Sequence, residues 1–127
     1  MRKFFYFAVN SSIDGTDTDE EAIMLPVDSL IAIEPNSTTE TTMIFAGKGV
    51  GDKGDADAQI KDVIAVQLNV TAANFKEFCR QIALYCNATG TGGRWTKDGM
   101  LVVAEGTSGF HSSVTACTSI VIASGTA

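Results

Sequence analysis

The sequence predicts a strand-rich α+β domain, in which about seven strands form an antiparallel sheet, sandwich or barrel and one amphipathic helix packs on it. Three observations lead to this fold class. Short apolar segments alternate with turn sequences rich in Gly, Asp and Asn. Residues 63–70 carry a large apolar side chain at every second position. Only residues 72–86 carry apolar side chains at helical spacing. Since 127 residues are a common size for one core, we expect a single domain over residues 1–127.

The first expected strand, residues 3–9, contains four consecutive aromatic side chains at residues 4–7. Neighbouring side chains of a strand point to opposite faces, so only one aromatic face can enter the core of the chain. The other face needs a cover, which can be a helix, a second sheet or another protein. We predict Phe5 and Phe7 as candidate contacts to a protein partner. The apolar run ends at Val9 and is too short for the hydrophobic region of a signal peptide.

One strand and a hairpin are expected in the next part of the chain, after a loop. Residues 10–21 are expected to form a polar acidic loop. The strand at 22–27 is expected at a sheet edge, because Pro26 cannot donate a backbone hydrogen bond. Residues 30–34 and 41–46 form a predicted hairpin, since a Pro-Asn-Ser turn sequence separates them.

The single helix follows a Gly- and Asp-rich loop, residues 47–58, and the strand at 63–70. Thr71 is the expected N-cap of a helix over residues 72–86. The apolar stripe of this helix consists of Phe75, Phe78, Cys79, Ile82 and Cys86. Leu84 lies off the stripe, so it is either an isolated surface residue or a contact to a partner.

The C-terminal part is expected to form a second hairpin and a long strand. Residues 94–97 and 100–104 flank an Asp-Gly pair, which is a strong signal for a two-residue turn. After another turn at 106–109, residues 110–123 form the last predicted strand. One face of that strand carries Val114, Ala116, Thr118, Ile120 and Ile122.

The charge balance argues against two classes of partner. The net charge is −6, whereas a nucleic-acid groove needs a basic stripe and an electrostatic membrane anchor needs a polybasic patch. No segment approaches the roughly 20 apolar residues of a transmembrane helix. We therefore expect neither nucleic-acid nor membrane binding.

The three cysteines are Cys79, Cys86 and Cys117, and an odd number does not suggest a disulfide framework. Cys79 and Cys86 would lie about 10 Å apart along a helix axis, which is too far for a bridge. We expect three buried free thiols in a reducing compartment.

No sequence pattern indicates a catalytic residue, a cofactor or a metal ligand. Residues 49–54 match G-x-G-x-x-G, but a dinucleotide site needs a helix directly afterwards, and the strand at 63–70 leaves no room for one. Two acidic clusters, in residues 14–21 and 52–57, lack the spacing of a calcium-binding loop.

His111 is the only histidine. A serine nucleophile would need it as a base, together with an acid that orients the ring. Ser112 and Ser113 adjoin His111, but neighbouring side chains on a strand point apart. We therefore expect a protein that is not an enzyme.

Arg94 and Trp95 stand next to each other at the start of an expected strand. Trp95 either caps the end of the core or anchors a protein interface, where Trp and Arg often dominate the binding energy. With Phe5, Phe7 and Leu84, these two residues complete the set of candidate interface residues.

Several segments carry a resemblance across nearly the whole chain: Arg-Lys-Phe-Phe-Tyr-Phe at 2–7, Leu-Pro-Val-Asp-Ser-Leu at 25–30, Ile-Glu-Pro-Asn-Ser-Thr at 33–38, Asp-Val-Ile-Ala-Val at 62–66, Val-Thr-Ala-Ala-Asn at 70–74 and Val-Thr-Ala-Cys at 114–117. Together they resemble small proteins encoded in the structural gene modules of marine tailed phages, including cyanophages. None of these segments is a catalytic motif, so the resemblance carries no active residue across.

The resemblance implies a structural protein of the virion, above all a capsid decoration (cement) protein that binds the outer capsid surface and stabilises the shell. The implied partners are the major capsid protein and further copies of this chain. The implied location is the virion, after assembly in the host cytoplasm. Two alternatives stay open: a neck or tail adaptor or tube component, and a small cytosolic binding module that acts during infection.

Overall fold

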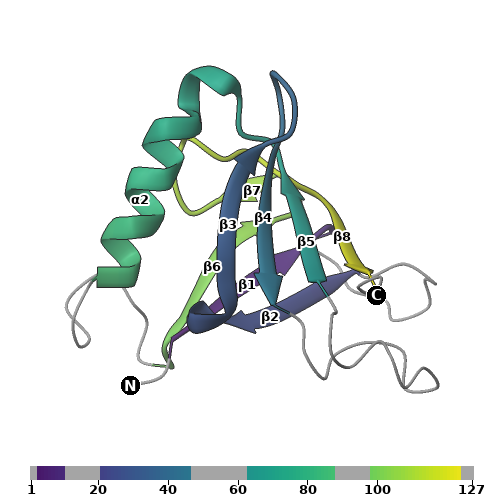
Figure 1. Cartoon of the computed structure of the whole chain (residues 1–127), viewed down its shortest axis with the longest axis vertical. Coiled ribbons are helices and arrows are strands. Elements are labelled where there is room, and N and C mark those ends of the chain that lie inside the picture. Colours follow the sequence, from purple (N-terminus) through teal and green to yellow (C-terminus); the bar gives the residue numbers. More distant parts are fainter. Residues whose placement is uncertain (1–2, 11–20, 47–62, 88–97, 124–127) are drawn as a thin grey trace.

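The computed structural model describes residues 3–10, 21–46, 63–87 and 98–123. These residues form two four-stranded sheets and one α-helix (Figure 1). The predicted strand-rich α+β fold class is therefore confirmed. No helix in the described ranges is long and apolar enough to cross a membrane.

Sheet A has the strand order β2-β1-β6-β7. Its strands are β1 (Phe4–Ala8), β2 (Ala22–Pro26), β6 (Met100–Glu105) and β7 (Ser108–Gly109). The edge position predicted from Pro26 is confirmed, because β2 pairs with β1 alone in the described sheet. Strands β1 and β6 run parallel, which departs from the antiparallel expectation. They are far apart in sequence, so no hairpin fixes their relative direction.

Sheet B has the order β3-β4-β5-β8, and all of its pairs are antiparallel. Its strands are β3 (Leu30–Pro35), β4 (Thr41–Ala46), β5 (Val63–Leu68) and β8 (Cys117–Ala123), and the short 3-10 helix η1 (Val27–Ser29) precedes β3. The predicted β3–β4 hairpin is confirmed. The predicted apolar face of β5 and the residues after it is also confirmed, since its four members are buried: Ile64, Val66, Leu68 and Val70.

The last strand is shorter than its sequence pattern suggests. It begins at Cys117, and residues 110–116 form turns and irregular backbone. Gln67 pairs with Ser119 and Leu68 pairs with Cys117, so Thr118 is an extra residue in β8 and forms a β-bulge. The bulge turns Cys117 into the core and leaves Thr118 exposed. The prediction that Thr118 shares a strand face with Ile120 and Ile122 is therefore wrong.

An aromatic cluster lies at the centre of the core between the two sheets. The ring centroid of Phe45 in β4 is 6.2 Å from that of Phe5 and 5.7 Å from that of Phe7, both in β1. Phe5 and Phe7 are themselves 6.4 Å apart, and all three contacts are edge-to-face. Each fully buried ring contributes about 1.5–3 kcal/mol to the stability of the fold.

The helix α2 (Phe75–Asn87) closes one side of the sandwich beside β3 (Figure 1). Phe78 and Ile82 enter the core, and the rings of Phe78 and Tyr85 lie 6.3 and 5.2 Å from that of Phe110. The predicted helix is confirmed from Phe75 onward, whereas its first residues form the 3-10 helix η2 (Ala72–Asn74).

The start of this helical segment differs from the expected cap. Thr71 occupies the N-cap position of η2 but makes no side-chain capping hydrogen bond. Instead, the backbone N–H of Ala72 donates to the carbonyl oxygen of Thr38, at 2.9 Å. The β3–β4 hairpin therefore satisfies the first backbone donor of this segment.

The cysteines are free, but only Cys117 is buried, whereas Cys79 and Cys86 are half-buried. The expectation of three buried thiols is therefore wrong for the two helical residues, which lie at the margin of the apolar stripe. Burial raises the pKa of all three thiols, to about 11 for Cys117.

Candidate interaction surface

The candidate interface residues fall into three groups. Phe5 and Phe7 are fully buried, so they present no surface to a partner, and their assignment as contacts is corrected to core residues. Leu84 is 41% exposed on α2, as the helical wheel suggests. Arg94 and Trp95 lie outside the described residues. The loop at 47–58, almost all of the acidic loop at 10–21 and the strand at 94–97 also lie outside them.

The alternation of β1 places Tyr6 on the outer face of sheet A, opposite to Phe5 and Phe7. Tyr6 pairs with Met24 of β2 on one side and with Val102 of β6 on the other. Met24 is 50% exposed and Val102 is 36% exposed, and Tyr6 between them is half-buried. These three side chains form one continuous row across three strands, which we call the Tyr6 row.

A second row lies beside the Tyr6 row on the same face. Phe4 pairs with Pro26 of β2 and with Met100 of β6. All three of these side chains are half-buried. The two rows together place six largely apolar residues side by side, because residues two apart on a strand share a face.

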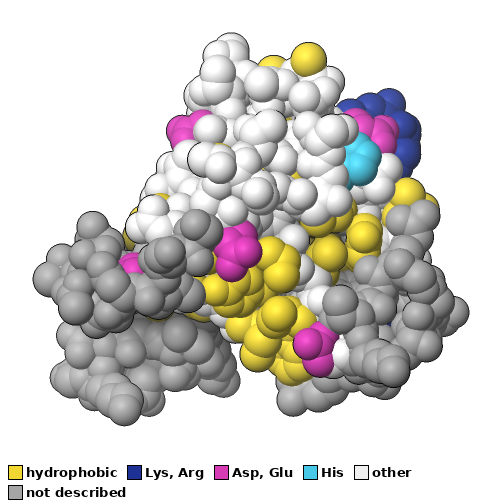
Figure 2. Space-filling view, turned by 180° about the vertical axis from the view of Figure 1, so that it is seen from behind, with side chains coloured by type: hydrophobic (Ala, Val, Ile, Leu, Met, Phe, Trp, Pro, Cys, Tyr) yellow, Lys and Arg dark blue, Asp and Glu magenta, His cyan; other side chains and the backbone are white. Residues whose placement is uncertain are grey.

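Figure 2 views the molecule from the side of sheet A. Hydrophobic side chains gather in the lower half of this view, and acidic side chains lie at their margin. The Lys and Arg side chains visible there lie at the upper right, on the side of the helix. Partial burial and the nearby Glu105 carboxylate raise the pKa of the Tyr6 phenol. Its hydroxyl therefore stays protonated at physiological pH and adds a neutral hydrogen-bonding group to the surface.

The outer face of sheet B is built from smaller and more polar side chains. One row runs through Ala32, Ile44, Ala65 and Val121, and the next row runs through Glu34, Thr42, Gln67 and Ser119. Val121 is 47% exposed. The outer rows of sheet A contain larger side chains, because they include the aromatic residues Phe4 and Tyr6 together with Met24 and Met100. Met suits irregular protein contacts because its side chain is flexible and polarisable.

A pocket of about 350 Å³ is lined by the neutral polar residues Thr39, Asn69, Thr71, Asn74, Ser113 and Thr115. Backbone hydrogen bonds hold two of its walls together, since the N–H of Thr115 donates to the carbonyl oxygen of Asn69 at 3.1 Å. These lining residues offer hydroxyl and amide groups but no formal charge, and they specify no particular ligand.

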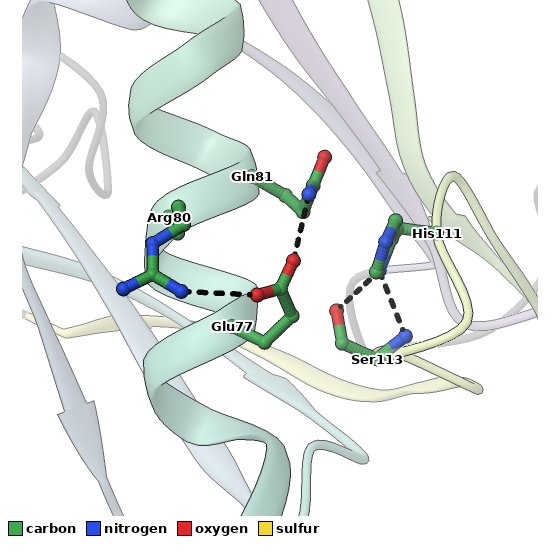
Figure 3. Close-up of polar contacts among 5 residues, drawn as sticks. All are labelled: Glu77, Arg80, Gln81, His111 and Ser113. Atoms are coloured by element: carbon green, nitrogen blue, oxygen red, sulfur yellow. Dashed lines mark hydrogen bonds and ion pairs between the residues drawn. The ribbon is translucent and has the colours of Figure 1, made fainter.

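The only histidine contacts Ser113 in a tight turn (Figure 3). The backbone N–H of Ser113 donates to His111 Nδ1 at 3.1 Å, and Ser113 Oγ lies 3.0 Å from the same nitrogen. The expectation that these side chains point apart is wrong for Ser113, which is two residues from His111 and would share a face with it even on a strand. Residues 110–116 form turns and irregular backbone instead. Ser113 is only 4% exposed, so this contact stabilises the turn and offers little access to its hydroxyl.

The nearest acid in Figure 3 is Glu77 of α2, and its contacts lie along the helix. Its carboxylate accepts hydrogen bonds from Gln81 Nε2 at 2.7 Å and from Arg80 Nη1 at 3.3 Å. The Gln81 hydrogen bond, followed by the Arg80 charge, lowers the pKa of the Glu77 carboxyl. No hydrogen bond joins His111 to Glu77 among the residues drawn in Figure 3, although the charge of His111 also contributes to the lowered pKa of the Glu77 carboxyl.

No group of three or more His, Cys, Asp or Glu residues in the described ranges is placed to hold a metal ion. The two acidic clusters considered for calcium lie almost entirely outside those ranges. Comparison with protein-family models, curated proteins and solved structures found no match of any kind. The outer face of sheet A is therefore the surface on which a functional proposal rests.

Proposed function

We propose that this protein is a structural component of a phage particle, a capsid decoration protein that attaches to the outer capsid surface through the outer face of sheet A. The observation that carries this proposal is the Tyr6 row, in which Met24 and Val102 expose large apolar side chains beside a tyrosine. Tyrosine and methionine are enriched at protein interfaces, and the centre of an interface is depleted of charge. The resemblance of the sequence to small phage structural proteins supplies the identity of the partner.

The chemistry of the face specifies the kind of capsid surface that would fit it. The centre requires apolar side chains on the capsid protein, because exposed apolar area is released from water on contact. The acidic margin seen in Figure 2 favours basic groups around that apolar centre. Many weak contacts of this kind stabilise a shell together when each decoration subunit bridges more than one capsid subunit.

Copy number in purified particles tests the proposal against its alternatives. Quantitative mass spectrometry of virions should find this chain in numbers comparable with the major capsid protein. A few copies for each particle would instead support the neck or tail alternative. Absence from virions would refute both structural roles and would leave a cytosolic binding module that acts during infection.

Surface variants then test the proposed face. Met24→Lys combined with Val102→Lys should weaken binding to undecorated capsids at least about tenfold, which corresponds to about 1.4 kcal/mol. The charges would be desolvated against an apolar partner surface. Ile31→Lys is the matched control, because Ile31 is 61% exposed but lies on β3 of sheet B.

Leu84→Lys tests the helix as a competing attachment surface. Circular dichroism first establishes that each variant is folded. Capsid binding by the folded sheet A variant at wild-type affinity would contradict the proposed face. A loss confined to Leu84→Lys would move the attachment surface to α2.

A further inference from the structure

The four outermost strands of the two sheets are not protected equally. An edge strand exposes unpaired backbone groups, and proteins commonly protect it with proline, charge, a bulge or short length. Strand β2 contains Pro26, and β7 has only two residues. Strand β3 contains Glu34 and Pro35, and its register shifts near Ile31.

Strand β8 lacks most of this protection. It has seven residues, Cys-Thr-Ser-Ile-Val-Ile-Ala, without a charged side chain or a proline. In the described ranges it pairs with β5 on one side only, and Figure 1 shows it at the outer edge of sheet B. Its bulge lies at Thr118, near its beginning. From Ser119 to Ala123 the register with β5 is regular.

The order of side chains in this regular part is self-complementary. When two copies of the strand pair antiparallel about Val121, each Ile120 lies opposite the Ile122 of the other copy. Ile120 and Ile122 face the core side of the sheet, where they are 6% exposed and half-buried respectively. The two Val121 side chains lie opposite each other on the outer face, where each is 47% exposed in the single chain.

We propose that β8 pairs with the β8 of a second copy of this chain, antiparallel and across a two-fold axis at Val121, which joins the two B sheets into one. The occupant is a second copy because this pairing places apolar side chains opposite each other on both faces. It also brings no charged side chain of either strand into the contact. The outer row through Ala32, Ile44, Ala65 and Val121 continues into the second copy without interruption.

This pairing uses an edge of sheet B, whereas attachment to a capsid would use the outer face of sheet A. The two proposals therefore stand or fall separately. A dimer can be tested on the isolated full chain without any phage particle.

The test uses two opposite charges at the symmetry axis. In Val121→Lys or Val121→Glu alone, like charges would lie directly opposite each other, which destabilises a strand pair. Sedimentation equilibrium of the wild-type chain should show a concentration-dependent dimer. For each variant that remains folded, the dissociation constant of the dimer should be at least about tenfold higher than that of the wild type.

A mixture of the Lys and Glu variants should form a heterodimer, because the opposite charges then face each other at the axis. Ile31→Lys, on the exposed edge of β3, should dimerise like the wild type. The proposal is overturned if the wild-type chain stays monomeric or if both single variants still dimerise. It is also overturned if Ile31→Lys dissociates equally, or if the mixture does not restore association. The proposal would likewise be overturned if β8 bound a strand of a different protein while this chain did not associate with itself.

Discussion

Phe5 and Phe7 on the inner face of β1 are fully buried, whereas Tyr6 on the outer face lies between side chains that are 36% and 50% exposed. The two faces carry similar aromatic residues, and only the alternation of the strand separates them. Sheet B covers the inner face, and its residue Phe45 contacts both Phe5 and Phe7. On the outer face, part of the apolar surface of the described residues remains open. Aromatic side chains therefore stabilise the fold on the inner face of β1, whereas on its outer face they suit contact with a partner.

The inner face should show the largest effect on stability. Phe7→Ala removes a ring that contacts both Phe5 and Phe45, so it should lower the free energy of unfolding by about 3–5 kcal/mol. Tyr6→Thr, one residue away on the outer face, should cost about 1 kcal/mol, because much of its surface is not in the core. Urea denaturation followed by circular dichroism measures both. Equal losses would show that the two faces of β1 do not differ as described.

The buried thiol extends this comparison to pH. The pKa of Cys117 rises from 9.0 to about 11 in the folded chain because burial disfavours the thiolate. The folded state therefore keeps its proton to higher pH than the unfolded state. The resulting stabilisation is complete below about pH 9 and is lost as pH rises towards about 11. Its size is on the order of 2–3 kcal/mol.

Urea denaturation at about pH 8 and about pH 10.5 measures this loss. Cys117→Ala is less stable at both pH values because it leaves a small cavity, but it should lose less stability between them. The half-buried Cys79 and Cys86 also have raised pKa values and contribute in both proteins. An identical alkaline loss in wild type and variant would exclude Cys117 as its main source.

Local patterns predicted the elements well. The alternation in residues 63–70, the Pro-Asn-Ser turn and the apolar stripe of the helix each depend on a few neighbouring residues, and each is confirmed. The edge position of β2 followed from Pro26, since proline removes one backbone donor. These features need no knowledge of the rest of the chain.

Features that depend on distant residues were predicted less well. The sequence indicated that one aromatic face of β1 needed a partner, but the choice of inner face depends on Phe45 in the other sheet. The parallel pairing of β1 and β6 joins residues nearly a hundred positions apart, which no local pattern records. The bulge at Thr118 likewise arises from the pairing with β5. For the candidate surface, alternation shows that Tyr6 opposes the core face, but only the pairing shows that Met24 and Val102 flank it.

A comparison of two exposed residues of β7 tests whether exposure alone decides which positions tolerate change. Gly109 of β7 is exposed, as the outer face of sheet A is, yet a Cβ atom there would lie 2.2 Å from the carbonyl oxygen of Val114. That oxygen belongs to the backbone, so it cannot move aside by a change of rotamer. Gly109→Ala should therefore lower the free energy of unfolding by about 1–3 kcal/mol. The neighbouring exposed Ser108→Ala should change it by less than about 0.5 kcal/mol. Urea denaturation of both variants decides the point, because equal stabilities would mean that the segment around Val114 can shift to admit a side chain.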